Sequence, residues 1–98
     1  MMNITIEELM NIEENINLID IRDKYQYDLG SIPNSINIPL NYLLINPTNY
    51  LNLDKKYYIY CDFGSRSEKL CEFLMDKGYN VINVTGGYNA YLVYIHKK

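Results

Sequence analysis

Residues 56–78 read KYYIYCDFGSRSEKLCEFLMDKG, and this stretch decides the fold. Its first part, 57–60, is a short aromatic and aliphatic run that is typical of a buried strand. Apolar side chains then recur with helical spacing, which predicts a helix over 67–77 that ends before Gly78. These side chains are Leu70, Cys71, Phe73 and Leu74. A strand that passes through a short loop into a helix is typical of an α/β protein.

Other segments continue this pattern on both sides of the loop. Thr5 and Glu8 form a capping box ahead of a short amphipathic helix. Residues 17–21 and 81–84 predict buried strands, and Gly86-Gly87 separates the second of these from a last helix. Strands that alternate with helices over short connections predict an α/β fold, with a mostly parallel sheet covered by helices on both faces.

Asp20 and Cys61 each lie at the carboxyl end of a predicted strand. In open parallel sheets, ligands bind beyond these ends. We therefore expect the functional site at this edge of the sheet.

Size and composition narrow the classes of function. The chain has 98 residues, 48% of them hydrophobic, so residues 1–98 predict one globular domain. A formal charge of -3 argues against a nucleic-acid partner, which would require clustered cations. Neither a secretory signal pattern nor a membrane-length apolar run is present, which predicts a cytoplasmic protein without a membrane partner. The abundance of Asn, Ile, Lys and Tyr suggests an AT-rich, bacterial genome.

The two cysteines are predicted to be free thiols, because Cys71 falls well inside the helix that Cys61 precedes. Cys71 has apolar neighbours and is expected to fill the core. His96 is expected in a frayed C-terminal tail without a chemical role, and the eleven tyrosines are expected to fill core edges.

The chemistry is expected at Cys61. A thiol between a strand end and a helix start meets unpaired amide groups and about half a positive charge from the helix dipole, and both favour the thiolate. Gly64 lets the loop curl with its amides pointing inward, and Arg66 adds a forked donor set suited to oxyanions. The loop therefore predicts a nucleophile inside an anion cradle.

The spacing of the loop separates two kinds of thiolate enzyme. In cysteine phosphatases, and in the arsenate reductases that resemble them in fold, five residues separate the nucleophilic Cys from the Arg of the active-site loop. Only four residues separate Cys61 from Arg66 here, which favours a loop that holds one sulfur atom. A phosphatase or arsenate reductase stays as an alternative.

Four separated stretches resemble the rhodanese-like domain family, in the family's order and over nearly the whole chain. They are Leu18-Ile19-Asp20-Ile21-Arg22 with its continuation through Tyr27, Gly30, Ile32-Pro33 and Ile36-Asn37-Ile38-Pro39; Tyr60-Cys61 with Gly64, Arg66 and Ser67; Gly78-Tyr79, Val81 and Asn83; and Gly86-Gly87 with Ala90 and Tyr91. The resemblance implies a small sheet of five parallel strands flanked by helices.

The resemblance also implies a single-domain sulfurtransferase that carries sulfur as a persulfide on Cys61, without a metal or other cofactor. Sulfur would pass from a small-molecule donor such as thiosulfate or a persulfide to a thiol or cyanide, or to a sulfur-relay protein. Asp20 and Arg22 would position the loop, although a purely fold-stabilising pair is an equal alternative. The loop that would hold the persulfide comprises Asp62, Phe63, Gly64, Ser65, Arg66 and Ser67.

The chain departs from the family pattern at four places. Ser31 replaces the usual His, Gln26 the usual Glu, and Asn34-Ser35 the usual Gly-Ala. Asp62 places a carboxylate beside the nucleophile, where it is expected to oppose thiolate formation and to repel a dianion such as thiosulfate. These departures keep open a second alternative, a binding or regulatory module without catalysis.

Overall fold

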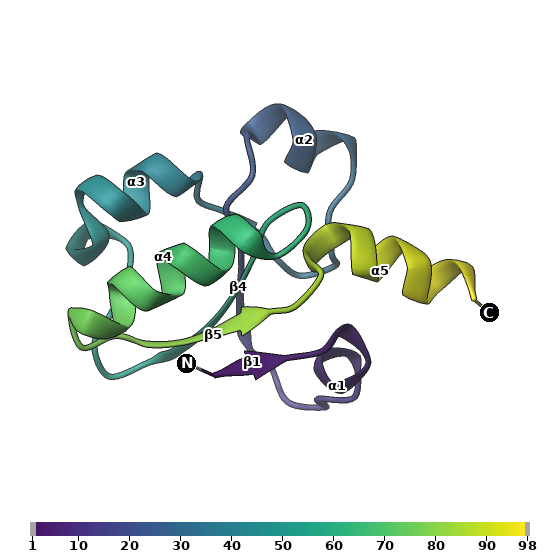
Figure 1. Cartoon of the computed structure of the whole chain (residues 1–98), viewed down its shortest axis with the longest axis horizontal. Coiled ribbons are helices and arrows are strands. Elements are labelled where there is room, and N and C mark those ends of the chain that lie inside the picture. Colours follow the sequence, from purple (N-terminus) through teal and green to yellow (C-terminus); the bar gives the residue numbers. More distant parts are fainter. Residues whose placement is uncertain (1, 98) are drawn as a thin grey trace.

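The computed structural model describes residues 2–97, and its strands form one parallel sheet (Figure 1). The spatial order is β1-β5-β4-β2-β3. The strands are β1 (Asn3–Ile4), β2 (Asn17–Asp20), β3 (Ile36–Asn37), β4 (Lys56–Tyr60) and β5 (Asn80–Val84). The predicted α/β class and the five-stranded parallel sheet are confirmed.

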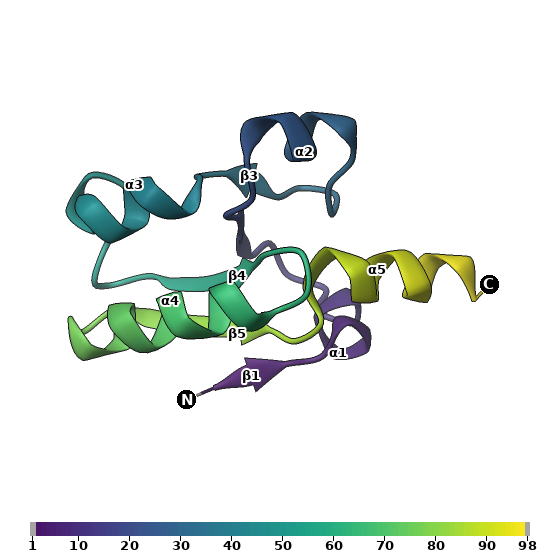
Figure 2. The same cartoon turned by 45° about the horizontal axis from the view of Figure 1, so that its top comes forward.

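Helices connect the strands and cover both faces of the sheet. They are α1 (Ile6–Met10), α2 (Lys24–Leu29), α3 (Leu40–Ile45), η1 (Pro47–Asn49, a 3-10 turn), α4 (Ser65–Asp76) and α5 (Gly87–His96). α3 and α4 contribute side chains to the same core cluster, and α1 lies next to α5 (Figures 1 and 2). No helix within residues 2–97 is long and apolar enough to cross a membrane.

The central strand β4 sends apolar side chains to both faces, because successive residues of a strand point to opposite sides. Tyr57 and Ile59 belong to the core beneath α3 and α4. Tyr58 and Tyr60 belong to the core beneath α1 and α5. Burial on both sides explains why this strand reads as a continuous apolar run rather than an alternating one.

The elements predicted from the pattern lie close to their expected positions. The capping box is present, since Thr5 Oγ1 accepts the Glu8 amide at 3.1 Å and Glu8 Oε1 accepts the Thr5 amide at 2.9 Å. α4 begins two residues before the expected start at Ser67. The reason is Gly64, whose φ of +101° turns the chain directly into the helix.

The C-terminal end differs from the expected frayed tail. His96 is the last residue of α5, and its Nδ1 lies 2.7 Å from the carbonyl oxygen of Leu92. A histidine in the last turn of a helix can hydrogen-bond a carbonyl of that helix, so His96 belongs to α5 rather than to a frayed tail.

Tyr60 fixes the loop between α2 and β3 from inside the core. Its hydroxyl accepts the Ile32 amide at 3.0 Å and lies 3.0 Å from Ser35 Oγ. Burial raises the pKa of Tyr60 above its ordinary value, while hydrogen bonds from Ser35 and Ile32 lower it and the Asp20 carboxylate raises it further. Tyr60 therefore stays a neutral phenol that joins β4 to the loop before β3.

We predict that Tyr60→Phe lowers the free energy of unfolding by about 1–3 kcal/mol, because the buried Ile32 amide loses its partner. Urea denaturation followed by circular dichroism measures this loss. Tyr25→Phe is the matched control, since Tyr25 is 74% exposed and its variant should stay within about 0.5 kcal/mol of the parent. Equal stabilities of the two variants would contradict the role of the hydroxyl.

Candidate functional site

Cys61 lies where β4 ends, and its sulfur is enclosed by the turn that follows. Sγ accepts the amide of Gly64 at 3.2 Å and the amide of Ser67 at 3.3 Å. The residue is 1% exposed. Both donors belong to the start of the 12-residue helix α4, so the sulfur lies at the positive end of that helix. This geometry suits a sulfur anion.

A chain of buried polar groups continues from the sulfur into the sheet. The Cys61 thiol donates to Ser67 Oγ at 3.4 Å, and Ser67 Oγ donates to Asn83 Oδ1 at 2.5 Å. Asn83 Nδ2 in turn donates to Asn3 Oδ1 at 3.1 Å. This series of hydrogen bonds orients the Ser67 hydroxyl beside the sulfur. Asn83 was not predicted as a site residue, although an amide between the apolar Ile82 and Val84 of β5 is the signal that marks it.

The first turn of α5 holds the loop from the other side. The Tyr88 amide donates to the Cys61 carbonyl at 2.8 Å, and the Asn89 amide donates to the Asp62 carbonyl at 2.9 Å. A Cβ on Gly87 would overlap the Cys61 carbonyl oxygen, and one on Gly64 would lie 2.9 Å from the Gly86 amide nitrogen. Glycine is therefore required where these two turns meet.

Asp20 and Arg22 form a buried ion pair at the same edge of the sheet. Arg22 Nη2 lies 2.8 Å from Asp20 Oδ2 and donates to the Gly30 carbonyl at 2.6 Å. The guanidinium carbon lies 4.1 Å from the centre of the Tyr88 ring. Burial opposes the charge of Arg22, but hydrogen bonds and attraction from Asp20 outweigh it and raise its pKa. Arg22 thus joins the ends of three chain segments.

Asp62 has several partners in the structure. Its carboxylate accepts Gln26 Nε2 at 3.2 Å and lies 3.3 Å from Arg66 Nη2 and 3.9 Å from Arg22 Nη1. From the sequence, this carboxylate is expected to oppose thiolate formation. Because two guanidinium groups face it, the carboxylate is compensated, and Arg66 is turned toward Asp62.

The loop residues differ in their exposure. Phe63 is 72% exposed, Ser65 is exposed, and Gly64 is buried. A shallow hollow next to the loop is lined by Phe63, Gly64, Ser65, Glu68, Asn83, Thr85 and Gly86. Within residues 2–97, no group of three or more His, Cys, Asp or Glu side chains could hold a metal ion.

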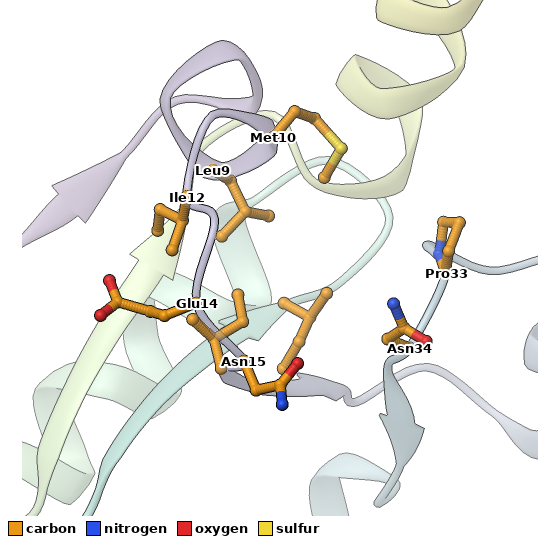
Figure 3. A pocket seen from close by; sticks show the side chains of 9 residues that line it. Leu9, Met10, Ile12, Glu14, Asn15, Pro33 and Asn34 are labelled. Carbon is orange, nitrogen blue, oxygen red and sulfur yellow. The ribbon is translucent and has the colours of Figure 1, made fainter.

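A more enclosed hollow lies elsewhere, between the end of α1 and the loop before β3. Figure 3 shows Leu9, Met10 and Ile12 on one side, facing Pro33 and Asn34 on the other. Its remaining lining residues are Glu14, Asn15, Ile16 and Leu18. None of the lining side chains is a thiol or belongs to the Cys61 loop, so this hollow contributes nothing to the candidate chemistry.

The second cysteine is buried, as predicted. Cys71 is 0% exposed and packs in the core beneath α3 and α4. Burial, together with the charges of Cys61 and Glu68, raises the pKa of Cys71 to about 12. Both thiols are free, which confirms the prediction from their positions.

The chain is similar in sequence and fold to several known proteins. The family model described as Rhodanese-like domain matches residues 5–93. A sulfurtransferase of Allochromatium vinosum is 34% identical over 79 residues, covering 80% of this chain and 73% of that protein. The crystal structure of a rhodanese-related protein from Thermoplasma volcanium has a TM-score of 0.87 and 33% identity, covering 96% of this chain and 93% of that one.

Two longer relatives match only in part. Adenylyltransferase and sulfurtransferase uba4 of Ogataea parapolymorpha is 41% identical over 71 residues, which are 71% of this chain but 18% of uba4. M-phase inducer phosphatase 2 of Rattus norvegicus is 35% identical over 75 residues, which are 68% of this chain and 13% of the phosphatase. The chain therefore spans less than a fifth of either protein.

We predict that Gly87→Ala costs more than about 3 kcal/mol of unfolding free energy, because its Cβ must displace the Cys61 carbonyl. Gly78→Ala is the matched control. Gly78 also has a positive φ, of +95°, but the nearest atom to its Cβ would be 3.7 Å away, so only about 1 kcal/mol of backbone strain is expected. Urea denaturation of both variants is the measurement, and equal losses would contradict the close packing of the two turns.

Cys71 should resist alkylation in the folded protein. At about pH 8, an exposed thiol with a pKa of about 8.5 is partly ionised, whereas a raised pKa keeps the Cys71 thiol neutral. We expect iodoacetamide to leave folded Cys61→Ser unmodified and to alkylate it fully in urea, as measured by mass spectrometry. Rapid modification of the folded variant would show that Cys71 is accessible and ionised.

Proposed function

The chain belongs to the rhodanese-like domain family, and on this premise we propose that it is a sulfurtransferase that carries sulfane sulfur as a persulfide on Cys61. The observation that carries the proposal is the enclosure of Sγ by the Gly64 and Ser67 amides at the start of α4. These two amides are already in place to stabilise a sulfur anion before the molecule that supplies sulfur binds. The proposed unit is a single domain comprising residues 1–98.

In the first step, the Cys61 thiolate attacks the outer sulfur of a donor. A bond forms between Sγ and that sulfur while the donor's sulfur–sulfur bond breaks, and its electron pair leaves with the remainder of the donor. With thiosulfate the remainder is sulfite. The amides that bind Sγ and those of the first turn of α4 would then face the persulfide, because first-turn amides lack intrahelical partners.

In the second step, an acceptor nucleophile attacks the outer sulfur and returns Cys61 to the thiolate. Cyanide would leave as thiocyanate, and a thiol would leave as a persulfide. A protein thiol is an acceptor of the same chemistry, and the relative named adenylyltransferase and sulfurtransferase supports a sulfur-relay setting. We propose a cytoplasmic location, where thiol acceptors are kept reduced.

The surrounding residues position the loop in this proposal. Asp20 holds Arg22, and Arg22 reaches both the Gly30 carbonyl and the Asp62 carboxylate. Arg66 contributes a cation at the loop, balanced by Asp62. No metal or cofactor takes part in either step.

A non-catalytic binding module is the second candidate, because Cys61 is only 1% exposed and its neighbour is a carboxylate. If Cys61 accepts no sulfur from any donor, the module is the better description. A phosphatase is less well supported by the four-residue spacing between Cys61 and Arg66, and turnover of p-nitrophenyl phosphate would favour it.

We predict that Cys61→Ser abolishes both the mass increase of one sulfur atom after donor treatment and thiosulfate:cyanide turnover. The reason is that the hydroxyl of serine is neither ionised near neutral pH nor able to hold sulfane sulfur. Mass spectrometry and thiocyanate detection are the measurements. Cys71→Ser is the matched control and should keep both activities, because Cys71 is buried in the core. Sulfur loading of the Cys61→Ser variant would refute the proposal.

A further inference from the structure

We propose that Asp62 selects the sulfur donor: its carboxylate occupies the cations of the loop and directs Cys61 toward hydropersulfides, R–S–SH, in preference to the thiosulfate dianion. This inference rests on the sulfur transfer proposed above and adds the chemical class of the donor.

Two cations flank the loop, and both are paired within the protein. Arg66 Nη2 lies 3.3 Å from Asp62 Oδ2, and Arg22 Nη1 lies 3.9 Å from Asp62 Oδ1. Arg22 also binds Asp20 at 2.8 Å. Two carboxylates therefore balance two guanidinium groups, and this cluster has no net positive charge with which to attract a dianion.

The carboxylate of Asp62 is held in place from a third side. Gln26 Nε2 on α2 donates to Oδ1 at 3.2 Å and lies 3.4 Å from Oδ2. The Asp62 side chain is 30% exposed. An anionic donor that binds Arg66 would therefore meet a fixed carboxylate 3.3 Å from the guanidinium group.

The hollow beside the loop also disfavours a dianion. Glu68 is one of its lining residues, and neither a lysine nor an arginine lines it. Phe63, at its rim, is 72% exposed. A surface with an aromatic ring and a carboxylate favours contact with the carbon chain of R–S–SH over contact with a sulfonate group.

The two donors place charge differently in the same displacement. With thiosulfate, the Cys61 thiolate approaches a dianion, and sulfite leaves with two negative charges. With a hydropersulfide, Sγ bonds to the terminal sulfur, the proton stays on that sulfur, and a single thiolate R–S⁻ leaves. By cancelling the positive charge of Arg66, the carboxylate of Asp62 therefore removes an attraction that thiosulfate needs more than a neutral hydropersulfide does.

The test compares the rates at which full-length parent and Asp62→Asn proteins take up sulfur on Cys61. The donors are thiosulfate, the hydropersulfide of 2-mercaptoethanol and persulfidated serum albumin, and uptake is followed by mass spectrometry. The measured quantity is the ratio of the hydropersulfide rate to the thiosulfate rate. Any general effect of Asp62 on the reactivity of the thiolate cancels in this ratio, so the ratio reports donor selection alone.

We expect the parent to load faster from hydropersulfides, and we expect Asp62→Asn to lower the ratio about tenfold, because removal of one charge relieves repulsion of a dianion and frees Arg66. Adding Arg66→Gln to Asp62→Asn should raise the ratio back toward the parent. Comparison of albumin with the 2-mercaptoethanol donor identifies whether the hydropersulfide source is a protein or a small molecule.

Asp28→Asn is the matched control, because it removes an equal charge from α2, where Asp28 pairs with Lys24 at 2.6 Å. Its ratio should equal that of the parent. A ratio unchanged by Asp62→Asn, or changed equally by Asp28→Asn, overturns the role of Asp62 while leaving sulfur transfer intact. Absence of loading from every donor in both proteins overturns sulfur transfer itself, and the inference with it.

Discussion

Two backbone hydrogen bonds, from the Tyr88 and Asn89 amides to the Cys61 and Asp62 carbonyls, are the contacts on which the candidate site depends. The amides of a first helical turn have no partner in their own helix, and here the nucleophile loop supplies their acceptors. The loop is thereby stabilised by α5 as well as by the hydrogen bonds among its own residues. The same contact places the Tyr88 ring against Arg22, and so connects α5 to the buried ion pair.

The sequence predicted the parts of the fold that have a strong local pattern. β4 and α4 are marked by an apolar run and by helical periodicity. α2 was not predicted, because it buries none of its residues and therefore shows no apolar stripe. β1 and β3 are two residues long, too short for any pattern, and only the family resemblance implied five strands.

The candidate site could be predicted to a similar extent and for the same reason. Cys61, Gly64 and Ser67 follow one another on the chain, so their proximity can be inferred from spacing. Gln26 and Asp62 are 36 positions apart, and only the packing of α2 against the loop reveals their hydrogen bond. The effect of Asp62 was judged from the sequence as a charge next to a thiol, but its partners come from three other positions. Electrostatic environment is a tertiary property, and a local sequence does not contain it.

The outermost strands are short, and this affects how readily the sheet pairs with strands of other molecules. β1 and β3 form the two edges of the sheet and contain two residues each. Long, flat edges expose rows of unpaired amides and carbonyls that recruit strands from other chains and lead to aggregation. Edges this short offer little template for such pairing, so they contribute little to aggregation in a crowded solution.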